Sequence, residues 1–260
     1  FMLMALLAPF IGKAPYFGNI EKILLPPSSA NLLGTDENGR DVLLQIVWGS
    51  RLSMAVGFFS ALISIVLGVF LGCLAGYFRG VTDAVIMKLI ESFMCFPALF
   101  IVLAVLSSVG PSIAVIILVL GLTSWVWTAR LIRGEMLKLH SQQHVIAAKA
   151  FGASPWRVIW CHMLPFALPP VLVTMSFTVA GAILAEAALS FLGFGAPPDV
   201  PSWGRLLAQG QGYADFAWWL TLPAGMAIFL LVYAYNRIGE ALRATFVPKT
   251  ALGKGGSWRF

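Results

Sequence analysis

The stretch MAVGFFSALISIVLGVFLGCLAGY, residues 54–77, decides the fold. It holds no charged residue and is longer than the ~20 residues that an α-helix needs to cross the hydrocarbon core of a bilayer. Within it Gly68, Gly72 and Gly76 recur at every fourth position. They therefore share one helix face and allow a second helix to approach closely. The stretch predicts a membrane-spanning helix packed against a neighbour.

The rest of the chain has the same apolar character. Hydrophobic residues make up 59% of the sequence, charged residues make up 11%, and the mean hydropathy is +0.88. Water-soluble domains are usually less apolar. Further apolar stretches occupy residues 90–109, 113–131, 166–189 and 218–235, and residues 1–11 are interpreted as the end of a first membrane helix. We expect an all-α membrane protein, a polytopic bundle of about six transmembrane helices with the first one truncated.

The charge of the chain follows the expected topology. The net charge is +6 and the pI is near 9.5, but the basic residues are spread over the loops. No nucleic-acid partner is therefore expected. With a cytoplasmic amino terminus, five of the 17 basic residues fall in outer segments, namely Lys13, Lys22, Arg40, Arg51 and Arg205. Basic residues favour the cytoplasmic side of a membrane, so this distribution predicts that orientation.

Two long connections lie on the expected outer side, residues 12–53 and 190–217. The second contains GFGAPPDVPSWG, residues 193–204, in which glycines and prolines impose an irregular path. We expect this connection to form a rigid outer lid. The transmembrane domain is expected to cover residues 54–248, followed by a cytoplasmic tail at residues 249–260.

The common signatures of an enzyme are missing from the sequence. No G-x-x-x-x-G-K-[ST] phosphate loop occurs, so the chain is not expected to bind and hydrolyse ATP. The run HSQQH, residues 140–144, lacks the glutamate that follows the first histidine in a zinc protease. The three cysteines, Cys73, Cys95 and Cys161, have no C-x-x-C spacing and are expected to be reduced thiols. We expect no catalytic residue, metal site or bound cofactor.

The most informative segment is the inner loop at residues 133–164, which contains HVIAAKAFGASPWRVIWCHML. Ala147 and Ala148 favour a helix, Gly152 permits a break, and Ser154 before Pro155 is typical of an N-cap with proline at the first helical position. The loop predicts a short helix, a turn and another helix on the cytoplasmic surface.

The pattern A-A-x-x-x-G followed by L-P resembles the cytoplasmic coupling loop of bacterial ABC importer permeases, whose alanine and glycine surface docks into a cleft on the ATPase subunit. Ile146 and His162 depart from the family pattern, which often has glutamate and isoleucine there. The missing carboxylate removes an exposed ion pair worth about 0–1 kcal/mol. The alternative is an ordinary amphipathic loop at the membrane surface. The resemblance implies a coupling role for Ala147, Ala148, Gly152, Ala153, Ser154, Leu164 and Pro165.

The run LLGTDENGRD, residues 32–41, resembles the L-G-T-D-x-x-G-R-D signature of the second permease subunit in the dipeptide, oligopeptide and nickel branch. The segments EAALSFLGFG, residues 186–195, and NRIGEALRATFVPK, residues 236–249, are similar to the same branch. In the first run a side-chain oxygen can accept backbone N–H bonds, a glycine can take a positive φ, and Arg40 can pair with Asp41. These residues either form a structural cap or contact the protein that delivers substrate. The outer motif comprises Gly34, Thr35, Asp36, Gly39, Arg40 and Asp41.

Glu186 and Ser190 lie near the expected outer mouth. An acid at membrane depth is costly, so Glu186 is a functional candidate. It either faces the translocation path, where it and Ser190 would form part of a gate, or makes hydrogen bonds between helices.

The resemblance implies a permease subunit that forms half of a path for peptides or for nickel and other metal chelates. The implied partners are a second homologous permease subunit, two ABC ATPase subunits that use ATP and Mg, and an extracytoplasmic substrate-binding protein. The implied location is the cytoplasmic membrane of a bacterium or archaeon, crossed several times. The alternative is a secondary transporter or channel that works without ATPases, for which more acids or broken helices at mid-membrane are expected.

Overall fold

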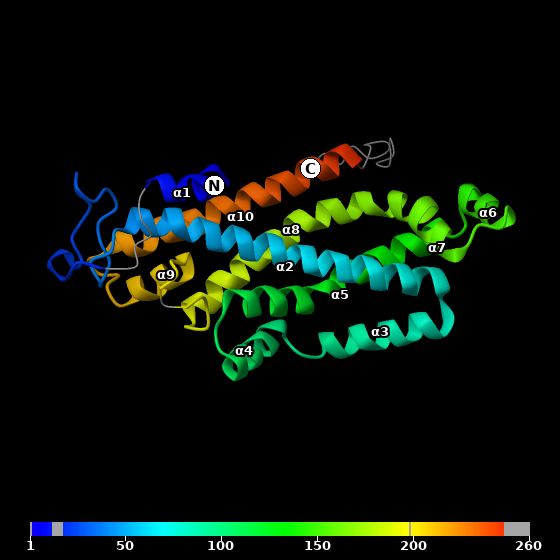
Figure 1. Cartoon of the computed structure of the whole chain (residues 1–260), viewed down its shortest axis with the longest axis horizontal. Helices are drawn as coiled ribbons and strands as arrows, with labels where there is room; N and C mark the ends of the chain where they lie inside the picture. Colours follow the sequence, from blue (N-terminus) through cyan, green and yellow to red (C-terminus); the bar gives the residue numbers. More distant parts are fainter. Residues whose placement is uncertain (1, 12–17, 198, 247–260) are drawn as a thin grey trace, which may run out of the picture.

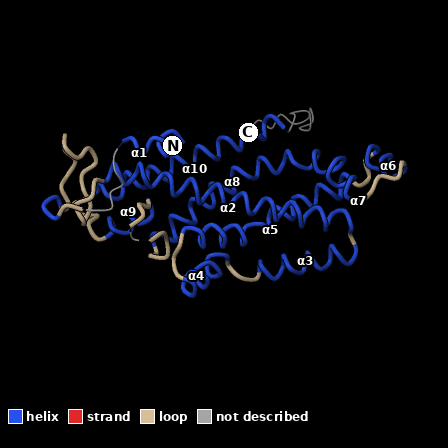
Figure 2. Tube along the Cα trace, in the orientation of Figure 1, coloured by secondary structure: helices blue, strands red, loops and turns tan. Residues whose placement is uncertain are grey.

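The computed structural model describes residues 2–11, 18–197 and 199–246 and shows an elongated bundle of helices (Figure 1). Within this part of the chain the regular elements are helical, and Figure 2 shows loops joining them with no strand. The elements are α1 Met2–Ile11, η1 Ile20–Lys22, α2 Val42–Phe78, α3 Gly80–Met94, α4 Ala98–Val109, α5 Ile113–Leu139, α6 Gln143–Ala150, α7 Pro155–Arg157, η2 Val158–Met163, α8 Leu164–Phe191, α9 Trp203–Gln211 and α10 Trp218–Phe246. The predicted all-α class is confirmed.

Four helical stretches are long and apolar enough to cross a membrane: α2, α5, α10 and the continuous run from α7 through η2 into α8. The pair α3 and α4 passes the same test together and makes a fifth span if it is counted as one. α1 is a short helix of 10 residues at the amino-terminal end of the described chain. The predicted tail at residues 249–260 lies outside the described residues.

The apolar stretch predicted at residues 90–109 is broken in the structure. α3 ends at Met94, α4 begins at Ala98, and their axes differ by 77°. Pro97 explains the break, because proline cannot donate an N–H and its ring disfavours the α conformation of the residue before it. A pattern of apolar residues predicts the length of a membrane span, but it does not predict a bend within the span.

α2 begins twelve residues earlier than the apolar pattern indicates, at Val42 instead of residue 54. The side chain of Asp41 caps this earlier start, since its Oδ1 accepts a hydrogen bond of 3.0 Å from the backbone N–H of Leu44. α2 therefore extends beyond the apolar stretch into the loops at its outer end.

The glycine face of α2 packs against α5, the most extensive helix pair in the fold. A Cβ atom added at Gly68 would lie 2.5 Å from Cβ of Thr128, and one added at Gly76 would lie 2.4 Å from Cβ of Met136. Both approaches are closer than real Cβ contacts allow. The predicted close approach of a second helix to this face is confirmed.

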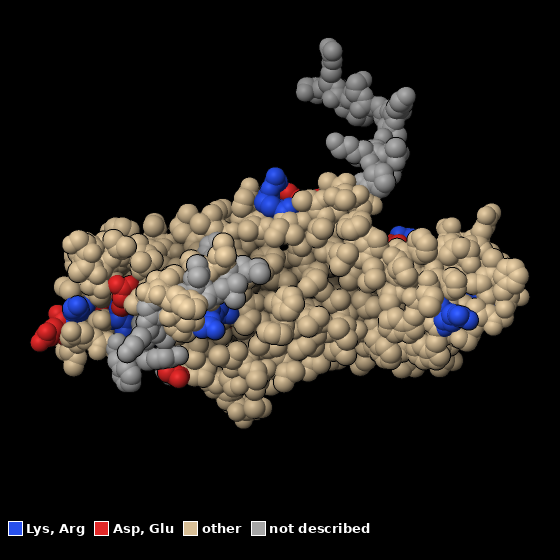
Figure 3. Space-filling view, turned by 45° about the horizontal axis from the view of Figure 1, so that its top comes forward, with Lys and Arg blue, Asp and Glu red and all other residues tan. Residues whose placement is uncertain are grey.

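The loops separate to opposite ends of the bundle. Residues 18–41 and α9 lie at one end, and α6 and α7 lie at the other (Figure 1). The face in Figure 3 is largely uncharged along its length, and its acidic side chains lie mainly toward the end with α9. The loops predicted to share a side of the membrane therefore do share an end of the molecule.

Candidate functional site

The predicted coupling loop folds as a short helix, a turn and a second helix, as the sequence indicates. α6 ends at Ala150, and Gly152 has a φ of +77°. The N–H of Ala153 donates to the carbonyl of Ala148 over 3.0 Å, which closes the helix end with a left-handed glycine. A Cβ at Gly152 would meet nothing within 4 Å, so backbone conformation and not crowding within this chain favours glycine here.

Ser154 occupies the predicted N-cap position, with Pro155 at the start of α7. Its backbone is extended and its carbonyl accepts a hydrogen bond of 3.0 Å from the N–H of Val158. The side chain of Ser154 makes no capping hydrogen bond. Ser154 therefore stands at the predicted cap position, but its exposed hydroxyl does not cap the helix.

The turn encloses a hollow of about 560 Å³ at the end of the bundle. Phe151 is 92% exposed at its edge, although a phenylalanine in a stable monomer is usually covered. Three residues of the predicted coupling set line the hollow, whereas Leu164 is buried and Pro165 lies outside it. The lining residues are Ala148, Phe151, Gly152, Ala153, Arg157, Cys161 and His162.

Buried contacts hold α6 against the bundle. Val145, the buried residue of α6, packs in one apolar cluster with Ile132 and Met136 of α5 and with Leu164 at the start of α8. His144 Nε2 lies 3.1 Å from the carbonyl oxygen of His162. The loop is therefore attached to both α5 and α8.

A second attachment joins α6 to the ends of α2 and α5. The ammonium of Lys149 lies 3.2 Å from each ring nitrogen of His140 and 5.1 Å above the ring of Tyr77. Burial lowers the pKa of His140, and the charges of Lys149 and Arg79 lower it further. Burial, followed by the charge of Arg79, likewise lowers the pKa of Lys149. No sequence pattern predicts this cluster, because packing brings its members together.

The outer motif folds into a compact loop stabilised from within. Asp36 is fully buried and its carboxylate accepts hydrogen bonds from the N–H of Asn38 at 2.9 Å, the N–H of Arg40 at 2.7 Å and the amide of Gln45 at 2.9 Å. Gly39 has a φ of +70°, as its role in the turn requires. The expected backbone acceptor and the expected positive φ are both present.

The expected pairing of Arg40 with Asp41 does not occur among the described residues. Asp41 instead caps α2 through Oδ1 and accepts a hydrogen bond of 2.7 Å from the side-chain amide of Asn31 through Oδ2. Both oxygens of the carboxylate are thus occupied by neutral donors. The charge of Asp41 stabilises the start of the helix, where partial positive charge gathers.

The motif is seated on α10. Trp219 Nε1 donates a hydrogen bond of 3.2 Å to the carbonyl of Thr35, and a Cβ at Gly34 would lie 2.8 Å from Cδ1 of the same indole. Thr35 itself is fully buried; its Oγ1 accepts from the N–H of Leu25 at 2.8 Å and donates to the carbonyl of Lys22. The geometry is that of a structural cap on the outer end of the bundle.

Glu186 is buried at the junction of three segments. Its carboxylate accepts hydrogen bonds from the hydroxyls of Ser190 at 2.7 Å, Ser202 at 3.0 Å and Ser53 at 3.2 Å. Glu186 is 0% exposed and Ser190 is 4% exposed. Neither side chain lines an open surface in this structure, and the contacts fit the alternative of hydrogen bonding between elements. A role of the two residues in a path or gate stays a prediction.

Trp203, the first residue of α9, fixes the segment that was expected to act as a lid. Its indole is fully buried and donates a hydrogen bond of 2.9 Å from Nε1 to the carbonyl of Ile46. A Cβ at Gly49 would lie 2.8 Å from Cδ1 of this ring, so the glycine makes room for it. This packing holds α9 against α2, and the rigidity expected of the whole connection at residues 190–217 stays a prediction.

Residues 68–246 match the family of binding-protein-dependent transport system inner membrane components. The chain belongs to this family. It is a multi-pass membrane component of a transport system, and membership implies partners that bind substrate and hydrolyse ATP. The predicted membership among importer permeases is thereby confirmed.

Relatives of this permease support the same family. A putative peptide transport system permease protein of Brucella suis is 38% identical over 95% of this chain and 84% of its own length. The dipeptide transport system permease protein of Bacillus subtilis is 36% identical over 95% of this chain and 78% of its own. A probable D,D-dipeptide transport system permease protein of Escherichia coli is 35% identical over 95% and 84%.

Solved structures share the fold of this permease. A chain of the methionine ABC transporter in an inward-facing form superposes with a TM-score of 0.66 at 19% identity, covering 79% of this chain and 98% of that one. A chain of an amino acid ABC transporter gives 0.59 at 15%, covering 77% and 94%. These likenesses concern the arrangement of helices.

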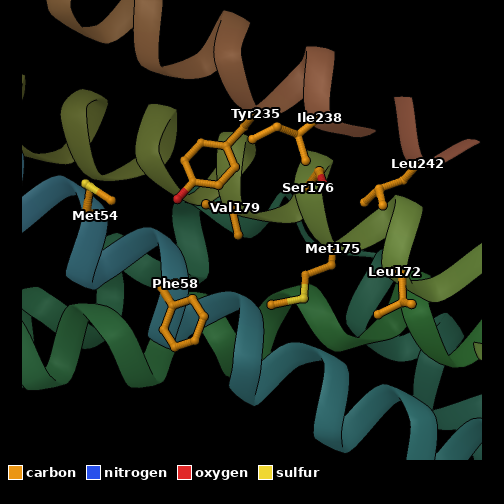
Figure 4. Close-up of a pocket in the computed structure, with 9 residues that line it drawn as sticks. All are labelled: Met54, Phe58, Leu172, Met175, Ser176, Val179, Tyr235, Ile238 and Leu242. Carbon is orange, nitrogen blue, oxygen red and sulfur yellow. The ribbon is translucent and has the colours of Figure 1, made fainter. Parts of the chain in front are cut away.

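Further hollows lie on the long sides of this permease. One, of about 570 Å³, opens between α2, α8 and α10, and its lining is apolar apart from the hydroxyls of Ser176 and Tyr235 (Figure 4). Another, of about 290 Å³, lies between α5 and α8 and is termed the α5–α8 groove. Its lining residues are Leu120, Ser124, Trp127, Thr174, Phe177, Thr178, Gly181, Ala182 and Ala185.

Proposed function

We propose that this chain forms half of the translocation path of a peptide importer and transmits movement from ATPase subunits through the loop around Gly152. The observation that carries the proposal is the hollow beside α6, rimmed by the exposed Phe151 and attached to α5 and α8. An exposed aromatic side chain next to a cavity is typical of a surface that a partner covers. Relatives named as peptide and dipeptide permeases support peptides as cargo.

Movement of the loop would reach the membrane helices through the attachments of α6. Val145 packs with residues of α5, and η2 continues directly into α8. Close-packed interiors transmit displacement because they have little free volume. A partner that moves α6 would therefore shift α5 and α8 together, which suits access that alternates between the two sides of the membrane.

The proposed assembly contains a second, homologous permease subunit, two ABC ATPase subunits that use ATP and Mg, and an extracytoplasmic substrate-binding protein. Its proposed place is the cytoplasmic membrane of a bacterium or archaeon.

Nickel and other metal chelates as cargo remain a prediction without support from the relatives reported above. Membership in this family speaks against the alternative of a secondary transporter, although the break at Pro97 is a feature that such a transporter would share. Uptake by the chain without ATPase subunits would favour that alternative.

Replacement of Gly152 by leucine tests the coupling proposal. We expect Gly152→Leu to abolish peptide uptake and co-purification of the ATPase subunits, because the new side chain enters the hollow. Gly193→Leu is the matched control. Gly193 ends α8 with a φ of +86°, and the N–H of Phe194 donates to the carbonyl of Leu189 over 2.8 Å in the same kind of turn.

A Cβ at Gly193 would also meet nothing within 4 Å. The two variants therefore carry the same backbone strain at opposite ends of the molecule. Loss of uptake in both to the same degree would attribute the effect to strain and contradict docking at Gly152. Full uptake and co-purification in Gly152→Leu would contradict it directly.

A further inference from the structure

We infer that the α5–α8 groove is the surface through which this chain contacts its cargo, and that it holds the main chain of a peptide with uncharged groups. The inference rests on the proposed function and adds the residues and the chemistry. None of the side chains that line the groove is ionisable. The groove itself therefore offers no counter-charge to a charged side chain and no acidic, histidine or cysteine ligand to a metal; Arg243 lines an adjoining hollow that shares Thr174 and Phe177 with the groove.

Trp127 is the first sign that the groove does not face lipid. It lies near the middle of α5, about 20 Å from either end at the usual rise per residue, and it is 64% exposed. Tryptophan in membrane helices favours the two interfaces, where its N–H reaches water or headgroups. Among the described residues the indole N–H of Trp127 has no hydrogen-bond partner. An exposed donor at this depth needs an acceptor from another molecule.

Hydroxyl groups complete the pattern. Ser124, one helical turn before Trp127, has a hydroxyl with no partner in the described part of the chain. Across the groove Thr174 Oγ1 donates to the carbonyl of Pro170 at 2.8 Å, and Thr178 Oγ1 donates to that of Thr174 at 3.0 Å. Both threonine oxygens keep lone pairs that can accept. α5 thus offers donors and α8 offers acceptors.

This arrangement matches the two polar groups of a peptide unit, one C=O and one N–H. An extended peptide leaves those groups free, whereas a neighbouring membrane helix has already used them internally. The groove therefore fits an extended peptide better than a helix of the second permease subunit. Recognition through the main chain is independent of side-chain charge, which suits a transporter of varied peptides.

Gly181 gives the groove its depth. It is exposed, and a Cβ placed there would meet nothing within 4 Å. Packing within this chain therefore does not require glycine at this position. The subunit has room for a Cβ atom there, and a larger side chain would extend from it into the groove, so Gly181→Leu is the variant chosen to block the groove.

The test uses the complete transporter with its binding protein saturated by peptide, reconstituted in vesicles. The probes are Ala-Ala, Ala-Lys and Ala-Glu, together with Ala-Ala methylated on its amide nitrogen. We expect Gly181→Leu to lower uptake of all probes about ten-fold or more while the subunits still co-purify. Trp127→Phe and Thr178→Val should each lower uptake of the three unmethylated peptides about five-fold, the factor of one ordinary hydrogen bond.

The methylated probe separates main-chain recognition from general damage. Thr178→Val should reduce the preference for Ala-Ala over its methylated form, because the acceptor for the amide N–H is gone. Gly225→Leu on α10 is the control, since a Cβ there meets only Leu207 Cδ2 at 4.0 Å; its uptake should stay near wild type.

Three outcomes would overturn the inference. The first is unchanged uptake in Gly181→Leu, and the second is a variant effect that depends on the charge of the peptide. The third is loss of subunit co-purification in Gly181→Leu, which would identify the groove as the interface with the second permease subunit. None of these alters peptide uptake by the wild-type complex, and failure of that uptake is what would contradict the proposed function itself.

Discussion

Glu186 is a buried acid whose carboxylate accepts hydrogen bonds from hydroxyl groups of three segments. Its depth in an apolar stretch marks it as costly to bury. The sequence cannot show that Ser53 and Ser202, far away along the chain, supply hydroxyls to its carboxylate. Those partners depend on the packing of α2 and of the segment before α9 against α8.

Replacement of Glu186 separates stability from transport. Glu186→Ala should lower the free energy of unfolding by ~3 kcal/mol or more, because it leaves a cavity and three hydroxyls without their acceptor. Glu186→Gln keeps the volume and one carbonyl oxygen, so the loss should be smaller and transport should persist. Thermal unfolding and peptide uptake of the purified complex check both. A Glu186→Gln complex of normal stability that transports nothing would support a role in the path.

The contact of α6 with the ends of α2 and α5 belongs to the scale of elements. The lowered pKa of His140 means that the docked loop binds a proton less readily than the undocked loop. The stability that neutral His140 contributes to docking of the loop is therefore fully present above the ordinary histidine pKa of about 6.5. This contribution decreases as the pH falls below that value. Arg79, Lys149 and the ring of Tyr77 are the groups that face this imidazole.

Hydrogen exchange measures this pH dependence. Protection of the α6 amides, corrected for intrinsic exchange, should fall between pH ~7.5 and ~5.5. His140→Phe keeps a ring beside Tyr77 and removes the titrating group, so its protection should change little over that range. An undiminished response in His140→Phe would contradict the assignment of the pH dependence to His140.

The sequence predicts an element correctly where a single residue type, such as glycine or proline, determines the local structure. The left-handed turn at Gly152, the proline start of α7 and the close packing of Gly68 and Gly76 follow from backbone conformation and side-chain size. The early start of α2 and the break at Pro97 were missed, because averaging apolar residues hides a capping aspartate and a single proline. The α5–α8 groove could not be found, since its two walls lie far apart in the chain.

At the scale of the whole molecule, the separation of loops to opposite ends predicts a definite sidedness. Cys161 is an exposed free thiol beside α6, and Asn38 is exposed in the outer motif. In a Cys95→Ser background and without ATPase subunits, a membrane-impermeant thiol reagent should label Cys161 only in inside-out vesicles. With Cys161→Ser and Asn38→Cys added, labelling should occur only from the outside. The reverse pattern would invert the orientation predicted from the basic residues.

The burial of Trp203 limits how cargo can enter the molecule. α9 is joined to α2 by the indole hydrogen bond to Ile46 and to α8 by the contact between Ser202 and Glu186. Movement of α9 away from α2 and α8 would expose both the indole of Trp203 and the buried carboxylate of Glu186, each at a cost of several kcal/mol. We therefore expect the outer end of this subunit to stay fixed during transport, so that a solute passes along the flank of the subunit instead of through its interior.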